Sequence, residues 1–167
     1  MIPSKLPNVG TTIFTTMSEL AAQTGALNLS QGFQDFNGPQ ALLESVGRHV
    51  MAGHNQYAPM SGLAALRQQV TIKVKRLYGV TVDPDHEVTI TPGATEAIFC
   101  AIQAVVQPGD EVIIFDPCYD SYAPSVALAG GRCVHLQLDP GDFSIDWQQL
   151  ADALTPRTRL VVLNSPH

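Results

Sequence analysis

The chain has 167 residues, of which 45% are hydrophobic and 14% are charged, and its net charge is −6. This length allows one domain with a buried core, and so apolar a composition excludes an intrinsically disordered chain. The acidic balance argues against nucleic acid as a partner, because phosphate backbones are bound by clustered Lys and Arg and only nine such residues are present.

The amino-terminal part of the chain is predicted to contain three helices separated by loops. Their predicted ranges are residues 13–23, 39–53 and 62–78. Pro39 suits the first turn of the second helix, and Gly79 directly follows the third. Lys73, Lys75 and Arg76 alternate with Arg67 along the third helix, and we interpret these four residues as a solvent-exposed helix face.

From residue 87 onward, short apolar runs alternate with helical patterns. The predicted strands cover residues 87–91, 111–115, 132–138 and 159–163, and the predicted helices cover residues 94–106, 119–129 and 147–154. Asp146 is placed to cap the last helix. The apolar runs at residues 112–115 and 160–163 suit strands buried on both faces. This alternation predicts right-handed βαβ units and therefore an α/β fold with a mostly parallel sheet.

The sequence shows no sign of disulfides, a metal site or a membrane span. The three cysteines have no CxxC spacing, so we expect free thiols in a reducing compartment, with Cys100 and Cys133 as small core residues. The five histidines show no metal-binding spacing, so no metal is expected. No apolar run is long enough to span a bilayer, and the first residues do not resemble a signal peptide. We therefore expect a soluble, cytoplasmic protein with no membrane partner.

The segment TPGATEA, residues 91–97, lies where a predicted strand meets a predicted helix. Gly93 allows a ligand to approach the backbone closely. The first helical amides, at Ala94 and Thr95, are then available to an anion, together with the Thr95 hydroxyl and the helix dipole. The alternative is that Gly93 only forms a tight turn. The segment has neither a GK[ST] nor a GxGxxG pattern, so it is not a P-loop or a dinucleotide-binding fingerprint.

The segment FDPCYDSYAP, residues 115–124, follows the next predicted strand. Pro117 ends this strand, and Tyr119 is then expected above the carboxyl ends of the strands, beside the proposed anion site. An aromatic ring in this place can stack on a planar heterocycle. The alternative is that Tyr119 packs in the core beneath a loop.

Three further segments contain candidate binding residues. Tyr57 lies in the Pro- and Gly-containing loop of NQYAPMSGLAALR, residues 55–67, where its hydroxyl is available or where it is simply a turn tyrosine. Gly32, in LNLSQGFQDF at residues 27–36, offers a bare amide to a carboxylate, or is an ordinary loop glycine. Asn164 ends the last predicted strand, in LVVLNSPH.

In their order and spacing, these five segments resemble the successive landmarks of the class I/II aminotransferases of fold type I, which use pyridoxal 5′-phosphate (PLP). They are most similar to the bacterial methionine aminotransferases and the related kynurenine/glutamine aminotransferases. The resemblance implies a PLP-transferase fold with an incomplete, mostly parallel sheet and flanking helices. It also implies an amino-terminal arm and substrate loop at residues 1–38, and the first part of the large PLP-binding domain at residues 39–167.

The resemblance also implies roles for individual residues. Gly93, Ala94 and Thr95 match the segment that holds the cofactor phosphate, and Tyr119 matches the aromatic residue that stacks on the pyridine ring. Three further residues match positions that contact the partner subunit, the substrate or the cofactor. Tyr57 corresponds to the tyrosine that crosses a homodimer interface to the partner's phosphate, Gly32 to the glycine whose amide meets the substrate carboxylate, and Asn164 to an asparagine lining the cofactor pocket.

Four functional residues of the family have no counterpart before His167: an Asn of an Asn-Pro pair, an Asp beside the pyridine nitrogen, the cofactor-linked Lys, and an Arg that binds carboxylate. Lys5, Lys73 and Lys75 lie outside the matching motifs. The resemblance therefore implies an amino-terminal fragment with half an active site and no catalytic residue of its own.

The activity implied for the full-length parent is transfer of an amino group between an amino acid, methionine or one with an aromatic or bulky side chain, and a 2-oxo acid. Two alternatives stay open. One is a cysteine-conjugate β-lyase of the same fold, and the other is a non-catalytic domain that binds anions or other proteins. The family's later residues, read in the encoding DNA, would distinguish an enzyme fragment from the second alternative.

Overall fold

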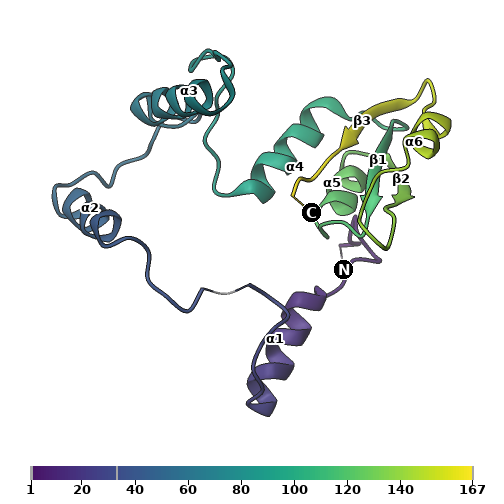
Figure 1. Cartoon of the computed structure of the whole chain (residues 1–167), viewed down its shortest axis with the longest axis horizontal. Coiled ribbons are helices and arrows are strands. Elements are labelled where there is room, and N and C mark those ends of the chain that lie inside the picture. Colours follow the sequence, from purple (N-terminus) through teal and green to yellow (C-terminus); the bar gives the residue numbers. More distant parts are fainter. Residues whose placement is uncertain (1, 33, 167) are drawn as a thin grey trace. The chain divides into compact units, whose positions relative to one another are not determined.

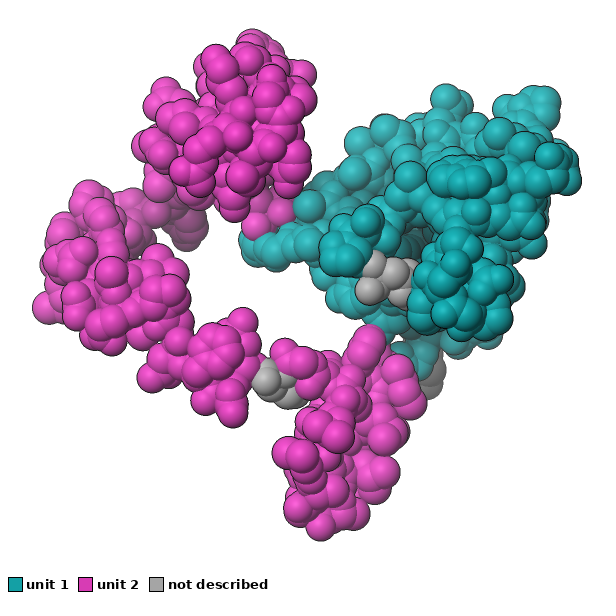
Figure 2. All heavy atoms as spheres, viewed as in Figure 1, with its two compact units in different colours: residues 1–10, 92–167 teal, residues 11–91 magenta. Residues whose placement is uncertain are grey.

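A computed structural model describes residues 2–32 and 34–166 of the chain. It divides the chain into two compact units, which Figure 2 shows in different colours: unit 1 is Met1–Gly10 with Pro92–His167, and unit 2 is Thr11–Thr91. Unit 2 contains α1 (Ile13–Thr24), α2 (Gln40–Met51) and α3 (Ala64–Tyr78). Unit 1 contains α4 (Ala94–Val105), β1 (Glu111–Asp116), α5 (Tyr122–Leu128), β2 (Arg132–Gln137), α6 (Trp147–Ala153) and β3 (Thr158–Val162) (Figure 1).

The three helices of unit 2 confirm the predicted elements, with ends that follow from their capping residues. The Thr12 side chain accepts a hydrogen bond from the backbone N–H of Thr15 and so begins α1. Gly25 and Gly79 end α1 and α3 in the left-handed conformation, with φ of 65° and 71°. Pro39 lies just before α2 rather than inside its first turn.

Two predictions for unit 2 are wrong. Residues 87–91 are not a strand in the structure. A strand needs a ladder of bonds to a neighbouring backbone, whereas the Glu87 N–H donates within a turn, to the Asp83 carbonyl, and the Ile90 N–H donates to the carbonyl of Ser61. Arg67 is not part of a solvent-exposed helix face. It is 8% exposed, and its guanidinium is hydrogen-bonded to carbonyl groups from other segments.

Unit 1 is built on a parallel sheet with the strand order β2-β1-β3. The central strand is buried on both faces, as the run at residues 112–115 predicts. On one face, Val112 and Ile114 pack with Ile102 of α4 and Val126 of α5. On the other face, Ile113 and Phe115 pack with residues that include Leu136, Leu138 and, from α6, Leu150 and Ala153. The α/β fold class is therefore confirmed.

Four details of unit 1 differ from the predictions. Helix α5 begins at Tyr122 because the preceding residues form a turn, closed by a bond from the Tyr122 N–H to the Tyr119 carbonyl. The run at residues 160–163 is only partly buried because β3 pairs on one side alone, and Leu163 is 62% exposed. Cys100 lies on the exposed side of α4, and Cys133 is only half-buried against the core.

One buried carboxylate joins the amino-terminal ends of the strands. Glu111, the first residue of β1, accepts hydrogen bonds from Arg132 at 2.7 Å, from the Thr155 hydroxyl at 2.7 Å and from Arg157 at 2.6 and 2.8 Å. These bonds favour the ionised form and lower the pKa of Glu111 to about 2. The cluster fixes the start of β1, and thus the end of the sheet opposite the candidate site.

Candidate functional site

The amino-terminal end of α4 is open to solvent. Gly93 precedes the helix with φ 87° and ψ 167°, a conformation that is essentially restricted to glycine. No side chain caps the helix, and the residues at 92–97 are exposed. The first backbone N–H groups of a helix have no acceptor within the helix, so Ala94 and Thr95 present amide donors at its positive end. This arrangement can bind an anion.

Tyr119 lies beside this helix end. Its hydroxyl oxygen is 3.1 Å from the Thr95 hydroxyl oxygen, so the two side chains are hydrogen-bonded. The Tyr119 ring also contacts the ring of Tyr122 edge-on, with centroids 5.8 Å apart. Tyr122 is buried, whereas Tyr119 is 42% exposed. Tyr119 is therefore held by two contacts, and the alternative that it packs in the core is wrong.

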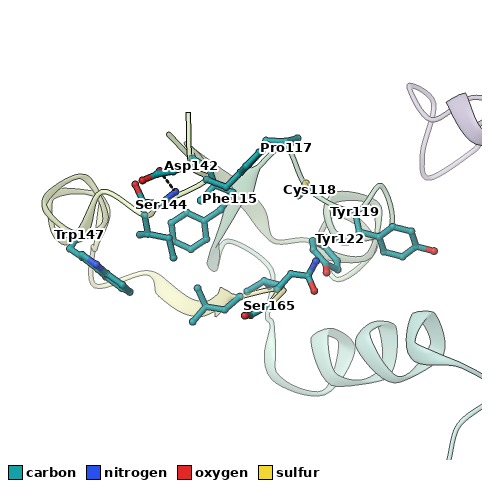
Figure 3. Close-up of a pocket in the computed structure, with 15 residues that line it drawn as sticks. Phe115, Pro117, Cys118, Tyr119, Tyr122, Asp142, Ser144, Trp147 and Ser165 are labelled. Carbon is teal, nitrogen blue, oxygen red and sulfur yellow. Dashed lines mark hydrogen bonds between the residues drawn. The ribbon is translucent and has the colours of Figure 1, made fainter. Parts of the chain in front are cut away.

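A cavity of about 560 Å³ lies at the carboxyl ends of β1 and β3. It is lined by Phe115, Pro117, Cys118, Tyr119, Tyr122, Leu138, Asp142, Phe143, Ser144, Ile145, Trp147, Val162, Leu163, Asn164 and Ser165. In Figure 3, Tyr119 and Trp147 lie at opposite ends of the labelled group, with Tyr122 between them. Ligands of open α/β sheets bind at this edge.

Two of the predicted residues, Tyr119 and Asn164, line this cavity, whereas Gly93, Ala94 and Thr95 do not. Tyr119 connects the two features, because it lines the cavity and is hydrogen-bonded to Thr95 at the helix end. Trp147 was missed by sequence reasoning although it directly follows the cap residue Asp146, whose carboxylate accepts the N–H groups of Gln148 and Gln149. The sequence signal that could have identified Trp147 is its position directly after a helix cap, at the carboxyl edge of the predicted sheet.

A loop between β2 and α6 forms one wall of the cavity. Asp142 accepts a hydrogen bond from the Ser144 backbone N–H at 2.8 Å (Figure 3), and the Ser144 hydrogen bonds lower the pKa of the Asp142 carboxyl. Phe143, between them, has φ 59°, the left-handed region that favours glycine. The hydrogen bond between Asp142 and Ser144 therefore closes the backbone around Phe143 and holds it in the left-handed conformation.

Polar groups also surround the end of β1. Asp116 accepts hydrogen bonds from His135 Nδ1 at 2.8 Å and from the Gln137 side chain at 3.3 Å. The pKa of the Cys118 thiol is raised to about 11, mainly by burial and to a smaller extent by a hydrogen bond with Asp116. The thiol is therefore neutral at ordinary pH and is not an activated nucleophile.

The other two predicted residues, Tyr57 and Gly32, belong to unit 2. Tyr57 is fully exposed in its loop, as predicted for an available hydroxyl. Gly32 is exposed as well, with open space where a side chain would begin. Its loop is attached to α1, because Asn28 donates to the Ser18 hydroxyl and Ser18 donates to the Gln31 side chain.

Within residues 2–32 and 34–166, no group of three or more His, Cys, Asp or Glu side chains is arranged to hold a metal ion. Over those ranges, every helix is too short or too polar to cross a bilayer.

Comparison with known proteins identifies relatives of this chain in sequence and in fold. A family model described as aminotransferase class I and II matches residues 24–167. Methionine aminotransferase from Escherichia coli (strain K12) is 57% identical over 168 residues, which cover 100% of this chain and 44% of the relative. Human kynurenine–oxoglutarate transaminase 1 is 37% identical over 163 residues, covering 89% of this chain and 38% of the relative. The chain thus spans less than half the length of these relatives.

Solved structures agree with the sequence comparison. The E. coli protein YbdL, for which a methionine aminotransferase function has been identified, superposes with a TM-score of 0.95 and 57% identity, over 100% of this chain and 44% of that chain. N-succinyldiaminopimelate aminotransferase from Mycobacterium tuberculosis gives a TM-score of 0.95 at 44% identity, with the same coverage of both chains.

Proposed function

Because the chain belongs to the aminotransferase class I and II family, we propose that it forms the phosphate-binding and ring-stacking part of an aminotransferase active site. Members of this family depend on PLP. The whole protein transfers an amino group between an amino acid and a 2-oxo acid. The observation that carries the proposal is the hydrogen bond between Thr95 and Tyr119 at the open end of α4.

The residues at this end of α4 fit the phosphate of PLP. The amides of Ala94 and Thr95 and the Thr95 hydroxyl would donate hydrogen bonds to it, and the helix dipole adds a favourable field. Gly93 allows the close approach because it has no side chain, and nothing lies within 4 Å of the place where a side-chain carbon would begin. When bound, PLP supplies an electron sink that stabilises negative charge at the substrate's α-carbon.

Tyr119 and Asn164 would contact the rest of the cofactor. The exposed face of Tyr119 suits stacking on a planar ring, while its hydroxyl is oriented by Thr95 and its ring by Tyr122. A ring held in this way excludes water from one face of the cofactor and limits its tilt. Asn164, on the cavity wall, offers amide donors and an acceptor to the ring substituents.

Methionine, or an amino acid with an aromatic or other bulky side chain, is the proposed amino donor. The 57% identity to E. coli methionine aminotransferase supports methionine. The Gly32 amide would receive the substrate carboxylate. The proposed organisation is an arm and substrate loop at residues 1–38, with residues 39–167 in the large cofactor-binding domain. The three free thiols are compatible with a cytoplasmic location.

A homodimer is part of the proposal. The fully exposed Tyr57 would donate its hydroxyl to the cofactor phosphate of the partner subunit. Exposed leucines on α2, Leu42 and Leu43, are further support, since apolar side chains of this size favour burial against another surface.

Isotope transfer by the whole protein tests the proposed activity. We expect ¹⁵N from labelled methionine to appear in the amino acid formed from an added 2-oxo acid, and more slowly from labelled aspartate. Release of ammonia and a thiol from a cysteine conjugate without ¹⁵N transfer would instead identify a β-lyase. Absence of both reactions in PLP-loaded protein would overturn the proposed activity.

A further inference from the structure

Arg67 is the one side chain of α3 that is buried, among the residues the structure describes. Its Nε donates to the Gly62 carbonyl at 3.2 Å. Its Nη1 donates to the Pro84 carbonyl and, at 2.9 Å, to the Asp85 carboxylate. One guanidinium thus connects α3, the loop before it and the turn at residues 84–85. The planar fork of Arg suits several acceptors at once, which a Lys ammonium matches poorly.

The contacts of Arg67 converge on the base of the loop that carries Tyr57. Next to Gly62, the Ser61 carbonyl accepts the N–H of Ile90 at 3.0 Å. Gly62 itself has φ 94°, and a side-chain carbon there would lie 2.5 Å from the Ile90 side chain. The loop base is therefore packed against the segment that leads along the chain to Gly93.

The rest of this loop has little support of its own. Tyr57 and Met60 are fully exposed, and within the described ranges the Tyr57 side chain makes no hydrogen bond or ring contact. The loop is anchored before Tyr57 at Asn55, whose side chain donates to the Val50 carbonyl at 3.0 Å, and after it at Ser61 and Gly62. The direction in which Tyr57 projects therefore depends on the backbone at both anchors. Ser61 and Gly62 are fixed by Arg67 and Ile90.

We infer that Arg67 is a positioning residue, which orients the Tyr57 loop so that the tyrosine hydroxyl meets a cofactor phosphate. This inference rests on the proposed function, in which Tyr57 contacts phosphate. The Asp85 carboxylate is largely exposed, so its ion pair with Arg67 contributes little. The bonds to the two carbonyls contribute more, because losing Arg67 leaves the Gly62 carbonyl at the loop base and the Pro84 carbonyl in the neighbouring turn without this donor.

The test compares PLP dissociation constants of the whole protein in four variants: Arg67→Gln, Tyr57→Phe, the double variant, and Arg76→Gln as an exposed control on the same helix. We expect Tyr57→Phe to raise the dissociation constant about tenfold, as for loss of one hydrogen bond to a charged group. Arg67→Gln should raise it several-fold, and Arg76→Gln should leave it unchanged. Because Arg67 acts through Tyr57, the double variant should bind no more weakly than Tyr57→Phe alone.

Amide hydrogen exchange provides a second readout that does not depend on activity. We expect faster exchange at Gly62 and Ile90 in Arg67→Gln, and an intermediate rate in Arg67→Lys, which serves if the Gln variant folds poorly. Multiplicative losses in the double variant, or slow exchange and unchanged PLP affinity in the Arg67 variants, would overturn the inference. If Thr95→Ala weakens PLP binding while Tyr57→Phe does not, this inference fails together with the proposed Tyr57 contact across the homodimer, and the phosphate site at α4 stands. If neither does, the proposed function fails as well.

Discussion

The hydroxyl oxygens of Thr95 and Tyr119 lie 3.1 Å apart and join the first turn of α4 to the loop that follows β1. The helix end is suited to an anion and the tyrosine ring to a planar group, so this hydrogen bond brings an anion site and a stacking surface together. PLP has a matching phosphate and planar ring in one molecule.

Thr95→Ala should weaken PLP binding because it removes a hydroxyl donor to the phosphate and the hydrogen bond that orients Tyr119. Loss of a hydrogen bond to a charged group corresponds to an increase of about tenfold or more in the dissociation constant. Equilibrium titration of PLP measures this change. Thr95→Ser keeps the hydroxyl and should bind nearly as well as the unaltered protein, and an equal loss in both variants would contradict the assigned role.

Substitutions of Tyr119 should distinguish its ring from its hydroxyl. Tyr119→Phe retains the stacking face and should weaken PLP binding only slightly, whereas Tyr119→Leu should weaken it by about two- to tenfold. The cofactor absorbance band should also shift in the Leu variant, because the ring loses its aromatic neighbour. Equal affinities of the Phe and Leu variants would show that the ring does not cover the cofactor.

Gly93→Ala should destabilise the fold through its backbone alone. Nothing lies within 4 Å of the position that the new carbon would occupy, but φ 87° with ψ 167° disfavours any side chain. The expected cost is about 1–3 kcal/mol in the free energy of unfolding, measured by urea titration. Gly10→Ala is the matched control, since Gly10 also has open space and no positive φ. Equal stability of the two variants would contradict the prediction.

Glu111 should contribute to acid stability. Its folded pKa of about 2 lies below its ordinary value of 4.5. The folded state therefore binds this proton less readily than the unfolded state. The contribution is complete above pH 4.5 and is lost as the pH falls toward 2.

Urea unfolding midpoints of Glu111→Gln, measured from neutral pH downward, test this assignment. The variant should be less stable at neutral pH, because Arg132 and Arg157 lose their shared carboxylate, and its stability should decline less between pH 4.5 and 2. Glu19→Gln, at an exposed site on α1, should change neither property. A parallel acid decline in Glu111→Gln and the unaltered protein would rule out the assignment.

The sequence predicted the elements whose signals are local. Helix α4 was predicted to within a residue, because Gly93 and the segment at 107–110 mark its two ends. The apolar run at 112–115 likewise predicted a strand buried on both faces, as β1 is. Residues 87–91 have the same β-rich pattern but form no strand with the described residues, because pairing depends on a neighbour that local sequence does not specify.

The contacts that sequence missed connect distant residues. Arg67 lies among other basic residues, and its burial depends on acceptors near residue 84, which no helical pattern predicts. Glu111 had a usable signal: a carboxylate begins an apolar strand, and an arginine begins the next strand, at Arg132. In a parallel sheet, these strand starts lie at the same edge, so the ion pair could have been inferred.

Backbone amide chemical shifts during titration with PLP test the central claim most directly, with pyridoxal, which lacks the phosphate, as the comparison ligand. We predict that PLP shifts the amides of Ala94 and Thr95 strongly and that pyridoxal shifts them far less, while both ligands perturb the Tyr119 ring signals. If PLP leaves the α4 amides unchanged, or if pyridoxal shifts them equally, this helix end does not bind the phosphate.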